Sequence, residues 1–239
     1  MRQVSLTFGD GTEVLDSVDL VVQREEMVAL IGPSGCGKST LLRLASGLLS
    51  PTSGTIECQR REIGYVFQDP TLLPWRTVLR NVEMFGELHG MRGSERRHRA
   101  RAALDAVGLS GFEDKYPKAL SGGMRMRASL ARSLLLRPRL FLFDEPFAAV
   151  DEITRQLLND QLMGLYCQER FAGVFVTHSI SEACYLANRV VVMTVRPGRI
   201  LGTVDLPFPY PRSEPLLYEP GFIERARQLS SLLAQASAR

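Results

Sequence analysis

The chain has 239 residues, of which 45% are hydrophobic and 23% charged, with 20 glycines and 13 prolines. This composition is typical of a globular protein with a sizeable core, and it excludes a disordered, collagen-like or coiled-coil chain. The net charge of +3 is too small to indicate a nucleic-acid partner, and none is expected. No apolar stretch reaches the roughly 18 residues that span a bilayer, so we expect a soluble, intracellular protein. The four cysteines lack the short paired spacing of a zinc or redox motif.

The first two segments predict a small antiparallel sheet. Residues 3–7 and 14–22 alternate loosely between apolar and polar side chains, which is typical of strands at the edge of a structure. The next segment, residues 27–31, is apolar throughout and predicts a buried strand of a parallel sheet.

Residues 32–40 carry the strongest motif of the chain. They read Gly32, Pro33, Ser34, Gly35, Cys36, Gly37, Lys38, Ser39 and Thr40. This G-x-x-x-x-G-K-[ST] pattern lies between a predicted strand and a predicted helix at 38–47, which is the context of a phosphate-binding loop. Glycines let backbone N–H groups turn toward phosphate oxygens, and the helix N-terminus adds a positive dipole. Lys38 supplies a charge for the β- and γ-phosphates, and Ser39 a hydroxyl ligand for Mg²⁺.

Residues 71–137 show helical patterns and no convincing strand, so we predict a helical subdomain inserted into an α/β domain. Its basic run at 92–101 favours a solvated helical face over contact with anionic lipid head groups. Trp75 lies beside two leucines and a proline. Because such an apolar group is costly to leave in water, Trp75 either packs within the insert or lines a groove for a membrane partner.

The apolar run at 140–143 ends in two acids, Asp144 and Glu145. Buried carboxylates without partners are costly. At the carboxyl end of a strand beside a phosphate loop, they have a use: Asp144 can hold Mg²⁺ and Glu145 can polarise the attacking water. The alternative, a strand that simply ends in polar residues, is disfavoured by the neighbouring loop.

The remaining segments complete an α/β alternation around a parallel core sheet. Predicted strands are residues 63–67, 173–177 and 189–194, and predicted helices are residues 124–136, 153–168 and 181–187. Prolines between 207 and 220 predict a stiff, extended linker, and 222–235 an amphipathic helix. The predicted division is therefore 1–205 for the main domain and 206–239 for the linker and C-terminal helix.

Three residues before the helix at 124 decide the family. Ser121, Gly122 and Gly123 follow Leu120, and together with the phosphate loop and the acidic strand end they resemble the signature of ABC-type ATPases. The resemblance covers about residues 3–205 and implies a P-loop NTPase fold with ATP and Mg²⁺ as cofactors. It also implies a head-to-tail homodimer, in which ATP lies between the phosphate loop of one copy and Ser121 of the other. Ser121 is itself a suitable N-cap for the following helix.

Further elements of the family occur in order. Gln68 resembles the Q-loop glutamine, which implies a ligand of Mg²⁺, and Asp151 resembles the aspartate of the D-loop. His178 resembles the switch histidine that contacts the γ-phosphate. Phe8 lies where an aromatic residue is expected to stack on adenine, although it could instead be an ordinary core residue of the edge sheet. Glu25 occupies the position of a usual glycine.

A finer resemblance points to importers. Residues 68–78, 144–149 and 196–200 are similar to the ATPases of nitrate, sulfonate and taurine importers. This implies an ATP-hydrolysing subunit, peripheral on the cytoplasmic face of the membrane, with two transmembrane permease subunits and a periplasmic or extracellular substrate-binding protein.

Two alternatives belong to other classes. One is a non-transport ABC ATPase of nucleic-acid maintenance or translation, which the single module and the missing coiled coil disfavour. The other is a module that binds ATP without hydrolysing it, which the presence of Glu145 and His178 disfavours. Finally, the position of Cys36 at a helix N-terminus predicts a lowered thiol pKa.

Overall fold

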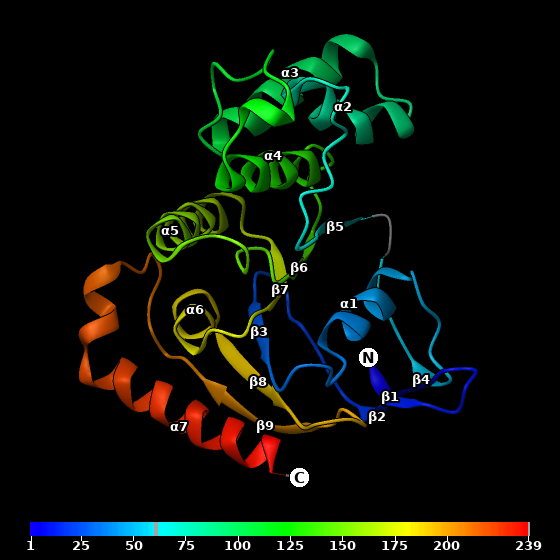
Figure 1. Cartoon of the computed structure of the whole chain (residues 1–239), viewed down its shortest axis with the longest axis vertical. Coiled ribbons are helices and arrows are strands. Elements are labelled where there is room, and N and C mark those ends of the chain that lie inside the picture. Colours follow the sequence, from blue (N-terminus) through cyan, green and yellow to red (C-terminus); the bar gives the residue numbers. More distant parts are fainter. Residues whose placement is uncertain (60–61, 239) are drawn as a thin grey trace.

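A six-stranded sheet runs through the centre of the molecule in the order β5-β6-β7-β3-β8-β9 (Figure 1). The computed structural model describes residues 1–59 and 62–238, so residue 239 of the predicted C-terminal segment lies outside the described residues. The strands are β3 (Met27–Ile31), β5 (Ile63–Val66), β6 (Leu140–Asp144), β7 (Ala172–Val176), β8 (Arg189–Met193) and β9 (Ile200–Asp205). All pair in parallel except β9, which runs antiparallel to β8. The predicted α/β class with a parallel core sheet is confirmed.

The central strand β3 is buried at all five positions because both faces of the sheet are covered. Successive side chains of a strand point to opposite faces. Val28 and Leu30 accordingly pack in one apolar cluster with leucines of the first helix, while Ala29 and Ile31 belong to a second cluster on the other face. This explains why the strands read as continuous apolar runs in the sequence.

The helices form two groups (Figure 1). Their bounds are α1 (Lys38–Ser46), α2 (Val78–Leu88), α3 (Gly93–Ala106), α4 (Gly122–Leu134), α5 (Glu152–Glu169), α6 (Ile180–Leu186) and α7 (Pro220–Ser237), with short 3₁₀ turns at Pro117–Ala119 and Glu214–Tyr218. Helices α2, α3 and α4 pack on one another beyond the end of β5 and β6, whereas α1, α5, α6 and α7 lie around the sheet. The basic run of α3 is only partly solvated, since Arg96 and Arg97 approach the buried Glu83 of α2.

A second sheet has the order β2-β1-β4 and is antiparallel, as predicted. It contains β1 (Arg2–Thr7), β2 (Glu13–Val18) and β4 (Ser53–Thr55). The prediction extended β2 to residue 22, but the strand ends at Val18. Strand β4 escaped prediction because its three residues, Ser-Gly-Thr, are all exposed and carry no apolar pattern.

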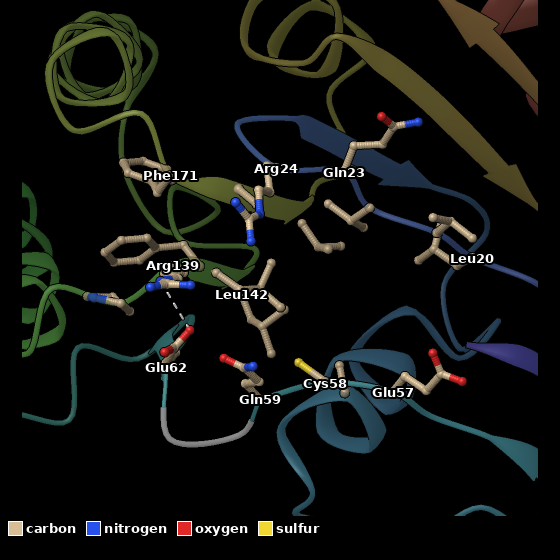
Figure 2. Close-up of a pocket in the computed structure, with 18 of the residues that line it drawn as sticks. Leu20, Gln23, Arg24, Glu57, Cys58, Gln59, Glu62, Arg139, Leu142 and Phe171 are labelled. Carbon is tan, nitrogen blue, oxygen red and sulfur yellow. Dashed lines mark ion pairs between the residues drawn. The ribbon is translucent and has the colours of Figure 1, made fainter.

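A cavity of about 820 Å³ opens between the two sheets (Figure 2). Its wall includes Arg24, Leu142 and Phe171, and the Arg139–Glu62 ion pair of 3.3 Å lies at its edge. The cavity reaches the amino ends of β6 and β7, since it is also lined by Leu140 and Ala172. It therefore lies at the amino ends of these strands, whereas the residues discussed below follow the carboxyl ends.

The tail differs from a free, stiff linker because Arg212 anchors it. Its guanidinium is buried and donates to the carbonyls of Cys184, Tyr185 and Ala187, at 2.9, 3.1 and 2.7 Å, at the C-terminal end of α6. The ring of Tyr210 lies 4.2 Å from the guanidinium carbon. Carbonyls at a helix C-terminus and an aromatic face both favour a cation. Helix α7 then packs on β8 and β9. The division of the chain at residues 205 and 206 stays a prediction.

We expect replacement of Arg212 to destabilise the protein strongly. The substitution Arg212→Met removes the buried donors of three helix-end carbonyls and should lower the free energy of unfolding by about 2–4 kcal/mol. Urea unfolding followed by circular dichroism measures it. The matched substitution Arg227→Met, at an exposed position of α7, should change stability by less than about 0.5 kcal/mol. Equal effects of the two substitutions would contradict the anchoring role.

Candidate nucleotide site

The phosphate loop joins the end of β3 to the start of α1. Gly37 is the N-cap residue of α1 and has a φ of 104°, a region that side chains rarely adopt. A Cβ at this position would also lie 2.7 Å from Leu15 Cδ2. The backbone conformation therefore requires glycine here, and a larger residue would also displace the tip of the Leu15 side chain. The carbonyl of Gly37 accepts from the N–H of Leu41 at 2.8 Å, so the helix begins directly after the loop.

Lys38 lies across the loop that contains it. Its Nζ is buried and donates to the carbonyls of Gly32 at 2.9 Å and Pro33 at 3.1 Å. These bonds place the ammonium group among the backbone groups of the loop. The ammonium group of Lys38, the N–H groups of the loop and the N-terminus of α1 thus lie together. Their positive charge suits a polyanion such as a triphosphate.

Ser39 and Asp144 meet across the sheet edge. The Ser39 hydroxyl donates to Asp144 Oδ1 at 2.6 Å, although 105 positions separate the two residues. Hydroxyl and carboxylate oxygens are hard donors that suit Mg²⁺. Among residues 1–59 and 62–238 there is no cluster of three or more His, Cys, Asp or Glu side chains that could form a metal cage. The Ser39 hydroxyl and the Asp144 carboxylate by themselves fit a hard cation such as Mg²⁺.

Glu145 and His178 form the second pair of the site. Glu145 Oε1 lies 2.7 Å from His178 Nε2, and the Glu145 N–H donates to the carbonyl of Val176. Glu145 has a φ of 49°, a left-handed conformation that is costly for this residue type and that often marks functional positions. The carboxylate is held beside the imidazole at the carboxyl ends of β6 and β7.

The remaining predicted residues lie outside the phosphate loop and the two carboxylate contacts. Gln68 is exposed in a bend after β5, and Phe8 lies just past β1 with 44% of its surface exposed, so it is no core residue. Ser121 caps α4 by accepting from the Met124 N–H at 3.2 Å, as expected, and Asp151 caps α5. Gly122 and Gly123 form the first turn of α4, which Figure 1 shows in the helical group beyond the sheet and away from α1. The signature residues and the phosphate loop are thus separate within one chain.

Sequence reasoning missed the loop that supports the phosphate loop from behind. Arg196 donates to the carbonyl of Gly35 at 3.2 Å. A Cβ on Gly198 would lie 2.0 Å from the carbonyl oxygen of Cys36, so only glycine allows this approach. The segment at 196–200 had served only as a family likeness. Its contact with Gly35, 161 positions earlier, left no local signal.

Two buried or half-buried arginines hold other loops of the site. Arg132 of α4 donates to the carbonyls of Pro70 at 3.0 Å and Thr71 at 2.9 Å, just after Gln68. Arg155 of α5 donates to the carbonyls of Phe147 and Val150, just before Asp151. Both arginines donate to backbone carbonyls of distant loops, contacts that no charge pattern reveals, and Arg155 is also paired with Glu152 Oε2 at 2.6 Å.

The predicted lowering of the Cys36 pKa is wrong. Cys36 is buried with 1% of its surface exposed, and this burial raises the pKa of the thiol above its ordinary value. The charge of Lys38 acts in the opposite direction but does not overcome burial. Loss of solvation opposes the thiolate, whereas the helix N-terminus alone would favour it.

Alkylation should therefore spare Cys36 in the folded protein. At pH 8 a raised pKa leaves little thiolate, so we expect iodoacetamide to modify the half-buried Cys167 at least about tenfold faster than Cys36. Peptide mass spectrometry after timed quenching measures both rates. In urea the two thiols should react alike. Preferential labelling of Cys36 in the folded state would contradict the buried environment.

Comparisons with known proteins agree with this geometry. A family model described as "ABC transporter" matches residues 15–148. An uncharacterized ABC transporter ATP-binding protein of Methanocaldococcus jannaschii is 43% identical over 232 residues, which is 94% of this chain and 86% of that protein. An aliphatic sulfonates import ATP-binding protein of Pseudomonas syringae pv. syringae is 45% identical over 211 residues, covering 87% of this chain and 86% of that protein.

Solved structures with a similar fold are also components of the ABC type. An ATP-binding cassette, solved as a dimer in a post-hydrolysis state with ADP and phosphate, has a TM-score of 0.75 and 32% identity, and the match covers 87% of this chain and 98% of that one. A component of an ABC transporter complex from Clostridium perfringens has a TM-score of 0.80 at 24% identity, which shows the shared fold. The chain belongs to the ABC transporter ATP-binding family and is an ATPase of that family.

Proposed function

We propose that this chain is the ATP-hydrolysing subunit of an importer, working as a homodimer with two permease subunits and a substrate-binding protein at the cytoplasmic face of the membrane. The observation that carries the hydrolytic role is the 2.7 Å contact of Glu145 with His178 beside the phosphate loop. Within the described parts of the chain, no helix is both long and apolar enough to cross a bilayer.

The residues of the site divide the work of phosphoryl transfer. The loop N–H groups and Lys38 hold the phosphates, and Ser39 with Asp144, joined by Gln68, would hold Mg²⁺. When bound, Mg²⁺ supplies positive charge that offsets the charge of the phosphate oxygens. Glu145 accepts the proton of the attacking water, and His178 orients that carboxylate and contacts the γ-phosphate. Phe8 stacks on adenine from its exposed position.

Two copies complete the site. Ser121 and the first turn of α4 offer a hydroxyl and free N–H groups to phosphate, but α4 and α1 lie apart within one chain. A head-to-tail partner brings its signature residues to the loop and its Asp151 to the interface. The dimeric state of the solved relative supports this arrangement.

The solute is best placed among small organic anions. Similar proteins from Pseudomonas syringae and Bacillus licheniformis are named as ATP-binding proteins of aliphatic sulfonate import. None of these relatives supports the non-transport alternative. Docking to the permease uses the surface around Trp75, whose side chain is 71% exposed beside α2, and which therefore does not pack within the insert.

Glu145→Gln tests the hydrolytic role. The amide keeps the size of the side chain but cannot accept the proton of water, so we expect ATP turnover to fall by about 10²–10⁴-fold while ATP still binds. Phosphate release and equilibrium binding measure the two effects. The control Glu224→Gln, on the exposed face of α7, should retain the wild-type rate. If Glu145→Gln keeps more than about a tenth of that rate, the assignment of the base is wrong.

Trp75→Ala tests the docking surface. Removal of this exposed ring should weaken binding to the cognate permease by at least about 1 kcal/mol and leave ATP affinity of the free subunit unchanged. Tyr218→Ala removes another aromatic ring with 71% exposure, in the tail, and should leave assembly intact. Co-purification and calorimetry distinguish the variants. A fall in melting temperature and ATP affinity without loss of assembly would contradict the docking role.

A further inference from the structure

Tyr65 reaches the Mg²⁺-ligand candidate from a strand that carried no predicted role. Its hydroxyl donates to Asp144 Oδ2 at 3.1 Å, while Asp144 Oδ1 accepts from Ser39 at 2.6 Å. Both oxygens of the carboxylate are therefore engaged, one from each side. The terminal torsion of an aspartate is otherwise broad, so this double engagement fixes the orientation of the group.

The tyrosine ring is itself fixed. Tyr65 stacks on Phe67 with ring centroids 4.1 Å apart and planes 20° from parallel. The hydroxyl of this stacked ring faces a carboxylate that is mostly shielded from solvent.

The backbone of Tyr65 links the same point to two loops of the site. Its carbonyl accepts a hydrogen bond from the hydroxyl of Ser133 at 2.9 Å. Ser133 lies on α4, the helix that begins at the signature residues. Tyr65 pairs with Leu142 in the register of β5 and β6, and Gln68 follows three residues later. Movement of β5, of the Q-loop that follows it or of α4 would therefore change the position of the Asp144 carboxylate.

We propose that Tyr65 is a positioning residue that orients Asp144 for Mg²⁺ and couples that carboxylate to the Q-loop and α4. Hydrogen-bond partners of metal ligands typically set affinity by fixing the ligand, and their loss costs about 10–100-fold. A purely structural role would explain the stacked ring but not the direction of the hydroxyl, which meets the carboxylate. The inference rests on the magnesium site of the proposed function.

The test compares metal dependence rather than turnover. Binding of the non-hydrolysable analogue AMP-PNP is measured by calorimetry in EDTA and over a Mg²⁺ series. For Tyr65→Phe, which keeps the ring, we expect the Mg²⁺ concentration at half-effect to rise about tenfold or more. Affinity in EDTA and the melting temperature should stay close to wild type, since neither depends on orientation of the metal ligand.

A matched control separates this role from a general loss of a buried hydroxyl. Tyr185→Phe also removes a tyrosine hydroxyl that donates to an aspartate, Asp160, at 2.6 Å, but on α6 away from the site. It should leave the Mg²⁺ dependence unchanged. In an Asp144→Ala background, Tyr65→Phe should have no further effect, because its partner is gone.

The outcomes are distinct. If Mg²⁺ fails to strengthen analogue binding to the wild-type protein, the proposed magnesium site is wrong and the inference falls with it. If wild type responds and Tyr65→Phe responds identically, the site stands and only the role of Tyr65 is overturned. An equal loss for Tyr65→Phe with and without Asp144 would likewise overturn it, since the effect would not act through that carboxylate.

Discussion

Ser39 and Asp144 lie 2.6 Å apart because neighbouring parallel strands end side by side. The same constraint organises the rest of the site. Parallel strands end at one edge of a sheet, so residues that follow β3, β5, β6 and β7 are gathered there although the sequence scatters them. The phosphate loop follows β3, Gln68 follows β5, Glu145 follows β6 and His178 follows β7. An order of β6-β7-β3 within the sheet thus places Glu145, His178 and the phosphate loop side by side.

Three arginines that take no part in the proposed reaction hold the loops at these strand ends. Arg196 bonds to the loop, Arg132 to the residues after Gln68, and Arg155 to those before Asp151. Each donates to backbone carbonyls and so holds the conformation of a loop, and Arg155 is paired with Glu152 and Glu182 as well. Transition-state charge is best stabilised by groups that are already oriented, which makes these remote supports part of the function.

Local patterns in the sequence revealed most of the sheet and the motif residues, because continuous apolar runs report burial on both faces. The contacts that span the fold left no such trace. The Gly198 approach to Cys36 and the Tyr65 bond to Asp144 join residues more than 75 positions apart. The pKa of Cys36 depends on burial, which the motif around it does not encode. Glu25 has a left-handed φ of 57°, which explains why glycine is usual at its position. The burial of Arg212 turned the predicted extended linker into a packed segment.

In the proposed head-to-tail dimer one chain carries only half of each ATP site, because Ser121 caps a helix of the group that lies apart from the phosphate loop. Sedimentation of Glu145→Gln with and without Mg-ATP tests this directly. We expect a shift from the 26.6 kDa chain to a species of twice that mass with ATP, and no shift when Ser121→Arg is added. A chain that binds ATP yet stays monomeric, or a dimer that is indifferent to Ser121→Arg, would contradict it.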